Sequence, residues 1–230
     1  MDENFSEFEN KIGFTFNDKQ LLKKAFTHRS YLNENRSEGL EHNERLEFLG
    51  DAVLALVTTD FLFARYPEKA EGELTAFRSA LVNTITLSKA ATTIGTNDHL
   101  LLSKGESKDT GRARQYILAD TFEAVIGAIY LDQGYEPSKI FIEKTLFPYL
   151  DEVVEKRLWQ DAKSHFQEKA QEVSGATPRY ETQKEIGPDH DKRFVVGVYV
   201  GDELVAEGEG KSKQEAEQMA AQKGLQSKGW

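Results

Sequence analysis

Apolar residues recur every three to four positions through most of the first 150 residues of the chain. The pattern is clearest in four segments, residues 16–28, 43–66, 74–95 and 115–134. A period close to 3.6 predicts amphipathic helices packed together. Residues that start and stop helices support this prediction. Asn17 or Asp18 can cap the first helix, and Pro67 and Gly134 follow the second and fourth helices. Residues 103–115 mix Gly, Ser, Lys and Arg without an apolar period, which predicts a mobile basic loop.

The pattern changes after residue 150. A short amphipathic helix ends near Val173, where Gly175 and Pro178 stop it. Three strand-like segments follow, RYETQKEI, RFVVGVYV and ELVAEGEG, and Gly201-Asp202 between the last two predicts a two-residue type II′ turn. Ser212 can cap a final helix, with Glu215 completing a capping box. The predicted order is helix, three strands, helix.

The amino-acid composition excludes several classes of protein and of active site. A length of 230 residues suits two domains, and a hydrophobic fraction of 39% is enough for packed cores. Because the chain has no Cys, disulfides, thiolate nucleophiles and Cys-based zinc sites are excluded. The acidic N-terminal segment resembles no targeting signal, and no apolar run approaches the roughly 20 residues that span a bilayer. We therefore expect a cytoplasmic protein without a membrane segment.

The formal net charge of -10 argues against nucleic-acid binding, which needs Lys and Arg against phosphates. Acidic residues outnumber basic ones both before and after Gln160. Any nucleic-acid binding would therefore depend on local basic clusters and be sensitive to salt.

Two apolar helical segments carry paired carboxylates. Glu47 and Asp51 are spaced i,i+4 with Glu44 one turn earlier, and Asp120 and Glu123 are spaced i,i+3. Ionised carboxylates in apolar surroundings cost several kcal/mol each unless a positive charge compensates them. A hard divalent cation, Mg²⁺ or Mn²⁺, would satisfy these oxygen donors.

A plainer interpretation of these acids remains open from the spacing alone. They would then cap helices or form ion pairs across the fold with Arg45, Arg78 or Arg114.

Several motifs in order resemble the ribonuclease III family. HNERLEFLGDAVL (residues 42–54) is similar to the family's signature, and ADTFEAVIGAIYLD (residues 119–132) to its second acidic motif. FTHRSY (26–31) and EGELTAFRSALVN (71–83) fit the same order. GPDHDKRF (187–194) and GEGKSKQEAEQMAA (208–221) resemble a double-stranded-RNA-binding domain. The resemblance implies an α+β multidomain chain, with an all-helical endonuclease and dimerisation domain at residues 1–150 and an α-β-β-β-α RNA-binding domain at residues 158–230.

The resemblance implies that Glu47, Asp51, Asp120 and Glu123 are the catalytic, metal-binding set. Glu44 and Glu71 would be supporting acids near the cleft. Two Mg²⁺ ions, with Mn²⁺ as a substitute and no organic cofactor, would promote hydrolysis of RNA phosphodiesters to 5′-phosphate and 3′-hydroxyl ends. Processing of rRNA precursors and other RNAs would be the cellular role.

The resemblance also implies a homodimer in which Phe48 packs into the partner. The alternative for Phe48 is a place in the chain's own core. Double-stranded RNA would be bound through its minor grooves and phosphates. The residues expected to contact it are Ser164, Gln167, Glu168, Gln171, His190, Lys211, Ser212 and Lys213.

Two other functions compete with the endonuclease. A non-catalytic RNA-binding scaffold would be expected if one of the four acids were replaced, but all four are present. A helical phosphohydrolase acting on small nucleotides would usually place His ligands beside the acids, and neither acidic motif has one between or adjacent to its pair.

Overall fold

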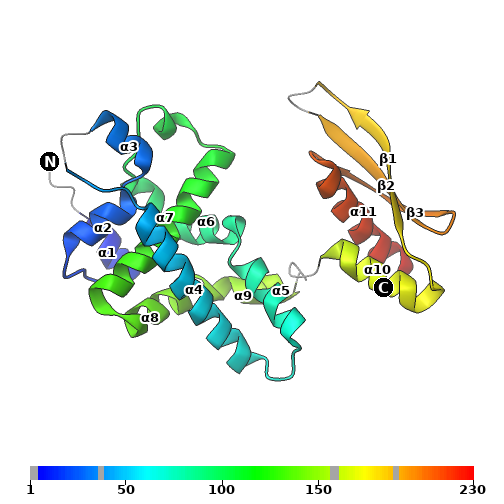
Figure 1. The fold of residues 1–230 in the computed structure, drawn as a ribbon, viewed down its shortest axis with the longest axis horizontal. Coiled ribbons are helices and arrows are strands. Elements are labelled where there is room, and N and C mark those ends of the chain that lie inside the picture. The colour runs from blue at the N-terminus through cyan, green and yellow to red at the C-terminus, as the bar shows by residue number, and fades with distance from the viewer. Residues whose placement is uncertain (1–4, 36–38, 156–160, 189–191) are drawn as a thin grey trace. The chain divides into compact units, whose positions relative to one another are not determined.

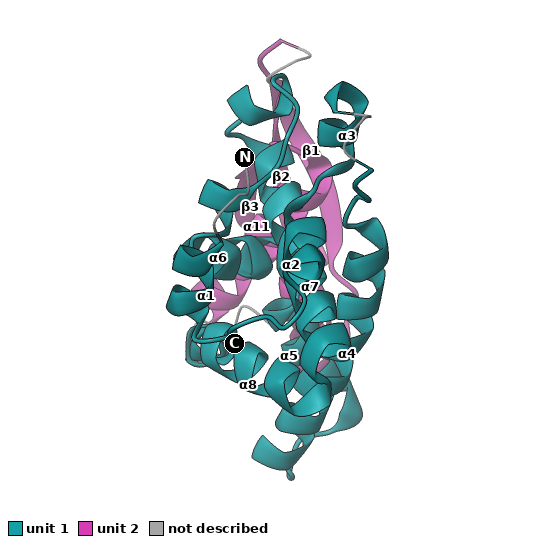
Figure 2. Cartoon of the chain, turned by 90° about the vertical axis from the view of Figure 1, so that its left-hand side faces the viewer, with its two compact units in different colours: residues 1–159 teal, residues 160–230 magenta. Residues whose placement is uncertain are grey.

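The computed structural model describes residues 5–35, 39–155, 161–188 and 192–230. The chain forms two compact units, Met1–Trp159 and Gln160–Trp230, which Figure 2 shows in different colours. Unit 1 is helical, and unit 2 contains a three-stranded sheet with two helices. The predicted order of a helical part followed by helix, three strands and helix is confirmed.

Unit 1 is built around two long helices, α4 (Glu44–Arg65) and α7 (Arg112–Gln133), which pack against each other more extensively than any other pair of elements (Figure 1). Its other helices are α1 (Ser6–Ile12), α2 (Lys19–Phe26), α3 (Arg29–Glu34), α5 (Glu71–Leu81), α6 (Thr84–Thr93), α8 (Tyr135–Thr145) and α9 (Leu150–Glu155), with short 3₁₀ turns η2 (Thr96–His99), η3 (Glu106–Lys108) and η4 (Phe147–Tyr149).

Two glycines set how closely α4 and α7 approach. A Cβ atom added to Gly50 would lie 1.8 Å from the backbone oxygen of Glu123, and one added to Gly127 would lie 2.2 Å from that of Leu46. No side chain fits at either position, so the backbones of the two helices are in direct contact. Around this crossing, the side chains of Leu54, Phe122 and their neighbours form one continuous core.

Two local predictions for unit 1 need correction. The apolar pattern of residues 74–95 is divided between α5 and α6, because the side chain of Asn83 accepts a hydrogen bond from the Thr86 N–H and starts a new helix. The segment 103–115 is not all loop, because α7 begins at Arg112. The guanidinium of Arg114 donates to the backbone oxygens of Asp109 and Glu106, which holds the segment against the helix.

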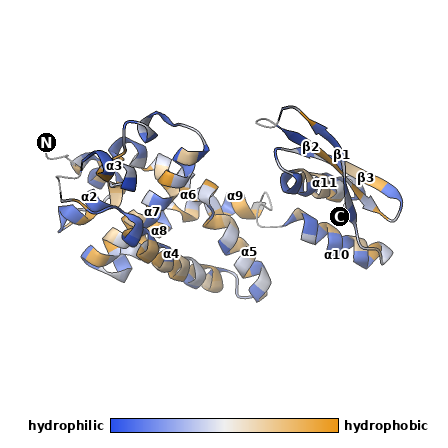
Figure 3. Ribbon diagram, turned by 45° about the horizontal axis from the view of Figure 1, so that its top comes forward, coloured by the Kyte–Doolittle hydropathy of each residue, from blue (hydrophilic) through white to orange (hydrophobic). Residues whose placement is uncertain are grey.

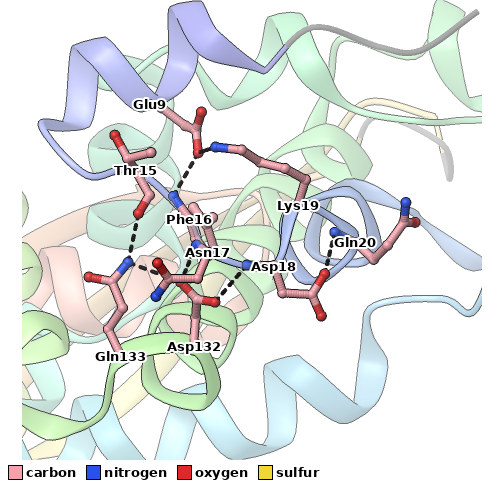
Figure 4. A network of polar contacts seen from close by, with 9 residues as sticks. All are labelled: Glu9, Thr15, Phe16, Asn17, Asp18, Lys19, Gln20, Asp132 and Gln133. Atoms are coloured by element: carbon pink, nitrogen blue, oxygen red, sulfur yellow. Dashed lines mark hydrogen bonds and ion pairs between the residues drawn. The ribbon is translucent and has the colours of Figure 1, made fainter.

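A polar network joins the connection between α1 and α2 to the C-terminal end of α7 (Figure 4). The buried carboxylate of Glu9 accepts hydrogen bonds from the backbone N–H of Phe16 (2.7 Å) and from Lys19 (2.5 Å). The carboxylate of Asp132 accepts from the backbone N–H groups of residues 17 and 18, at 2.8 and 2.9 Å. These bonds satisfy backbone donors that no helix uses, and they anchor the N-terminal helices to α7.

Unit 2 begins with α10 (Ala162–Ser174), which ends at Gly175 as predicted, and Gly175 has a left-handed conformation. The antiparallel strands β1 (Arg179–Ile186), β2 (Arg193–Val200) and β3 (Glu203–Gly210) follow in that order in the sheet. Gly201, with φ of 60°, begins the predicted two-residue turn between β2 and β3. Helix α11 (Lys213–Lys228) packs on β2 and β3, and α10 packs on α11. The small core consists of Phe166, Val198, Ala220 and Ala221.

Candidate functional site

The acidic residues of the two motifs lie on the two helices that cross at the centre of unit 1. Glu47 and Asp51 are on one side of α4, in the turns that flank Gly50. Asp120 and Glu123 are on α7, and Glu123 is the residue whose backbone touches Gly50. The helix crossing therefore brings together two acidic pairs that are about 70 residues apart in the chain.

These carboxyl groups repel one another in a partly buried environment. The pKa of Glu123 is raised to about 8, first by burial and then by three neighbouring carboxylates, Asp51, Asp120 and Glu47. Burial also raises the pKa of Glu47, and Asp120, Glu44 and Asp51 raise it further. Burial raises the pKa of Asp120 as well. All of these effects disfavour the charged form. No basic side chain is among the causes that shift the pKa values of Glu123, Glu47 and Asp120.

Arg45, Arg78 and Arg114, the arginines considered as ion-pair partners of these acids, interact with other groups. Arg78 donates to the hydroxyl of Thr59, and Arg114 to the loop before α7. Arg45 is among the charges that lower the pKa of the exposed Glu41. Ion pairing with these arginines therefore does not explain the acids at the crossing.

The donor set fits a divalent metal ion. Among the described residues, no group of three or more His, Asp or Glu side chains is arranged as a metal-binding cluster, so the acidic side chains would have to converge on an ion. Their chemistry favours a hard cation, because all the donors at the crossing are carboxylate oxygens. Burial and then repulsion by the neighbouring carboxylates raise the pKa of Glu123, and a bound cation would offset both effects.

The two supporting acids lie in different places. Glu44 adjoins the cluster at the start of α4, where one carboxylate oxygen lies 3.6 Å from Arg29 and the other 3.8 Å from His42. Glu71 starts α5 and lines a pocket with the C-terminal half of α4, beside Thr59 and Phe63. Along α4, that pocket is roughly 12 Å from Asp51, given a rise of about 1.5 Å per residue. Within one chain, the structure thus groups Glu44 with the four acids and places Glu71 apart from them.

Helix α4 is rich in hydrophobic residues, as the colouring of its ribbon in Figure 3 shows. Several of its large apolar side chains are exposed. Phe48 is 81% exposed, Phe63 72% and Leu56 58%. At about 100° per residue the three lie within roughly 80° of one another around the helix, next to the side that carries Glu47 and Asp51. The alternative that Phe48 belongs to the chain's own core is therefore wrong. Large apolar side chains grouped on an exposed helix face are typical of interaction sites.

The predicted RNA-contacting residues of α10 share its exposed face. Phe166 and Ala170 on the opposite face enter the core of unit 2. The outward residues are Ser164, Gln167, Glu168 and Gln171, all of them exposed. They offer hydroxyl, amide and carboxylate groups along one line, which suits contacts with 2′-hydroxyls and base edges in a minor groove.

The start of α11 presents the predicted basic residues to solvent. The Ser212 side chain accepts from the Glu215 N–H and caps the helix, while the Glu215 carboxylate accepts from the Lys211 N–H at 2.8 Å. Glu215 therefore reaches one residue before the cap, a variant of the predicted capping box. Lys211 and Lys213 are exposed. The remaining predicted contact, His190, lies outside the described residues.

Comparisons with known proteins now identify both units. Residues 18–150 match the family model described as ribonuclease-III-like, which covers more than half of the chain. Residues 162–228 match the model for the double-stranded RNA binding motif. The chain belongs to the ribonuclease III family. It is a double-stranded-RNA-specific endoribonuclease with a C-terminal double-stranded-RNA-binding domain.

Similar proteins carry the ribonuclease III architecture over nearly the whole chain. Ribonuclease 3 of Geobacillus kaustophilus is 47% identical over 97% of this chain and 90% of its own length. Ribonuclease 3 of Pelotomaculum thermopropionicum is 46% identical over 94% of this chain and 90% of its own. The solved nuclease domain of ribonuclease III from Campylobacter jejuni is 42% identical, with a TM-score of 0.56, and it covers 63% of this chain and 99% of its own.

This family membership decides between the competing functions. A non-catalytic scaffold and a phosphohydrolase acting on small nucleotides are both rejected in favour of the endoribonuclease. None of the helices in the described ranges of this ribonuclease III family member combines the length and hydropathy needed to cross a membrane.

Sequence reasoning missed two features of this ribonuclease III family member. The first is the crossing at Gly50 and Gly127, which a glycine inside each long apolar helix could have signalled. The second is Glu185, whose contacts with lysines of unit 2 depend on an irregular strand pairing. No periodic pattern in the sequence reveals such an irregularity.

Proposed function

We propose that Glu47, Asp51, Asp120 and Glu123 form the catalytic site at which this endoribonuclease cuts double-stranded RNA. The observation that carries the proposal is the meeting of the four carboxylates where α4 crosses α7, at which burial and then Asp51, Asp120 and Glu47 raise the pKa of Glu123 to about 8. Acids whose pKa values are shifted by burial and by specific neighbouring charges cluster at functional sites. We assign the site to two Mg²⁺ ions, for which Mn²⁺ can substitute.

The proposed reaction is hydrolysis without a side-chain nucleophile. Water attacks phosphorus, the bond from phosphorus to the 3′ oxygen breaks, and that oxygen takes up a proton, which leaves 5′-phosphate and 3′-hydroxyl ends. The bound cations would lower the pKa of the attacking water and stabilise negative charge in the transition state. The four carboxylates bind and orient the cations, and Glu44 supports Glu47 from one turn away. Substrates of this chemistry include rRNA precursors and other folded RNAs.

We assign catalysis and dimerisation to residues 1–150 and duplex binding to residues 158–230. The exposed residues of α10 and the start of α11 would contact the RNA, together with His190. Minor-groove contacts read the shape of the duplex, and the lysines hold its phosphates. One chain carries one cluster of acids, so two copies are needed to cut both strands.

The test of this function uses a labelled perfect RNA duplex and a matching single strand, each incubated with Mg²⁺ or with EDTA. Cutting of the duplex alone, only with Mg²⁺ and with 5′-phosphate ends, is the expected result. Binding of the duplex without cutting in Mg²⁺ would contradict the assignment of the four acids.

Stability without metal should depend on pH in a way that reports the acidic cluster. The pKa values of Glu123, Glu47 and Asp120 are raised in the folded chain, so the folded state holds more protons than the unfolded state between about pH 4.5 and 8. The free energy of unfolding in EDTA should therefore fall as the pH rises through this window. Thermal unfolding at several pH values measures it, and added Mg²⁺ should raise the midpoint more at pH 8 than at pH 5.5.

Glu123→Gln removes the largest of these shifts and should flatten the pH profile in EDTA. Glu143→Gln, at an exposed position on α8, is the matched control and should leave the profile unchanged. Identical profiles for wild type and Glu123→Gln would show that folding does not raise the pKa of Glu123.

Phe48→Ala should weaken the proposed homodimer. The Phe48 ring is 81% exposed in the single chain, and burying it in a partner would make it an anchor of the interface. We expect the dimer dissociation constant to rise by at least about tenfold, since hot-spot truncations typically cost about 2 kcal/mol or more. Sedimentation equilibrium measures the constant. Val173→Ala, which truncates a similarly exposed residue in unit 2, should leave it unchanged.

A further inference from the structure

Glu185 lies near the end of β1 and is turned toward the helices of unit 2 by an irregularity in the sheet. The pairing of β1 with β2 shifts between Thr182 and Lys184, so that Thr182 lies opposite Val196 and Glu185 opposite Phe194. Paired residues project to the same face of a sheet, and Val196 faces the interior beneath α11. With regular pairing, Glu185 would lie opposite Arg193 and project to the other face.

On the helix-bearing face, the carboxylate of Glu185 meets two lysines. One oxygen lies 3.2 Å from the Nζ of Lys213 at the start of α11, and the other lies 3.3 Å from the Nζ of Lys192, the residue before β2. The Lys213 ammonium also lies 5.5 Å from the centre of the Phe194 ring. Hydrogen bonds from Lys213 and then Lys192 lower the pKa of Glu185, so the group is a carboxylate at neutral pH.

Both lysines lie close to the proposed phosphate contacts, because they meet at the same carboxylate. Lys213 is one of the proposed contacts, and Lys192 directly follows the segment that contains His190. We infer that Glu185 limits the affinity of this enzyme for double-stranded RNA, because its carboxylate occupies the two lysines that would otherwise hold phosphates. The inference rests on the proposed RNA contacts of unit 2 and deepens them.

The effect follows from charge. Lys192, Lys213 and Glu185 together present one net positive charge in place of two, and a phosphate approaching Lys213 must compete with a carboxylate already beside it. Neighbouring Glu215 cannot replace Glu185 in this role, because its carboxylate is bound to the backbone N–H of Lys211. An acidic chain with net charge -10 thus carries a negative group inside its own basic cluster.

The test is Glu185→Gln in the full chain, with binding to a perfect RNA duplex measured in EDTA over a series of salt concentrations. The amide keeps the size of the side chain and removes its charge. We expect affinity at physiological salt to rise about three- to tenfold, and the slope of log affinity against log salt to steepen by roughly one. With Mg²⁺, KM for duplex cleavage should fall while kcat stays the same.

Glu181→Gln is the matched control, because Glu181 is an exposed residue of the same strand whose carboxylate lies 3.1 Å from Arg179 instead of a lysine of the cluster. It should leave affinity and slope unchanged. Unchanged or weaker binding by Glu185→Gln would overturn the inference and would indicate that the carboxylate positions the lysines productively.

Lys213→Ala separates this inference from the proposed function. It should weaken binding, and the gain from Glu185→Gln should shrink in its background. If Lys213→Ala binds the duplex as well as wild type, the proposed phosphate contact fails and the role of Glu185 fails with it. If Lys213→Ala weakens binding while Glu185→Gln has no effect, only the role of Glu185 is wrong.

Discussion

Glu123→Gln should reduce duplex cleavage on the order of a thousandfold, because loss of a carboxylate proposed to bind the metal would remove several kcal/mol of transition-state stabilisation. The amide is nearly the same size but carries no negative charge with which to bind a cation. Duplex binding should persist, since the proposed RNA contacts lie in unit 2. Single-turnover cleavage of a labelled duplex at saturating Mg²⁺, together with a binding titration in EDTA, measures both effects.

Glu143→Gln is the control for this substitution, as it changes an exposed glutamate on α8 in the same way. It should cleave at the wild-type rate. Cleavage by Glu123→Gln within tenfold of wild type would remove Glu123 from the proposed set of ligands. Loss of duplex binding in the same variant would instead contradict the separation of catalysis from RNA binding.

Gly50→Ala should destabilise unit 1 by about 3 kcal/mol or more, at the upper end of the usual cost of overpacking a core. The added Cβ would lie 1.8 Å from the backbone oxygen of Glu123. A backbone atom inside a helix cannot rotate out of the way as a flexible side chain can. The helices α4 and α7 would have to separate, and the carboxylates that they carry would separate with them. We therefore expect both a lower thermal unfolding midpoint and a large loss of cleavage.

Gly72→Ala provides the comparison within the same unit. Gly72 lies in α5 with nothing within 4 Å of its added Cβ, so alanine should be neutral or stabilise the helix by about 0.5–1 kcal/mol. Equal midpoints for Gly50→Ala and Gly72→Ala would show that the close crossing of α4 and α7 is not required. A stable Gly50→Ala variant with full activity would show that the close crossing of α4 and α7 does not position the carboxylates of the site.

Local patterns in the chain predicted most of the elements. The apolar period located the segments that became α4 and α7, and the glycines and Ser212 marked ends that the structure confirms. The pattern failed over residues 74–95, because an apolar period continues across Asn83 although the chain changes direction there. A side-chain hydrogen bond, which periodicity does not record, decides that boundary.

The candidate site was predictable in its residues but not in its environment. Acid pairs inside apolar helices indicated buried carboxylates, and the family motifs singled out Glu47, Asp51, Asp120 and Glu123. The arginines considered as their ion-pair partners were equally visible in the sequence. Only the fold shows that Arg78 and Arg114 are engaged elsewhere.

By itself, the sequence determined that this protein has a helical unit followed by an α-β-β-β-α unit, because helix period, turn residues and motif spacing act over short stretches of chain. It also singled out the acids and lysines that we propose carry its chemistry. The tertiary structure decided which distant residues meet. The close approach at Gly50 and Gly127 joins two acidic pairs from separate helices, and a shift in strand pairing turns Glu185 toward Lys213. Both outcomes depend on packing between segments far apart in the chain, and no local pattern encodes that packing.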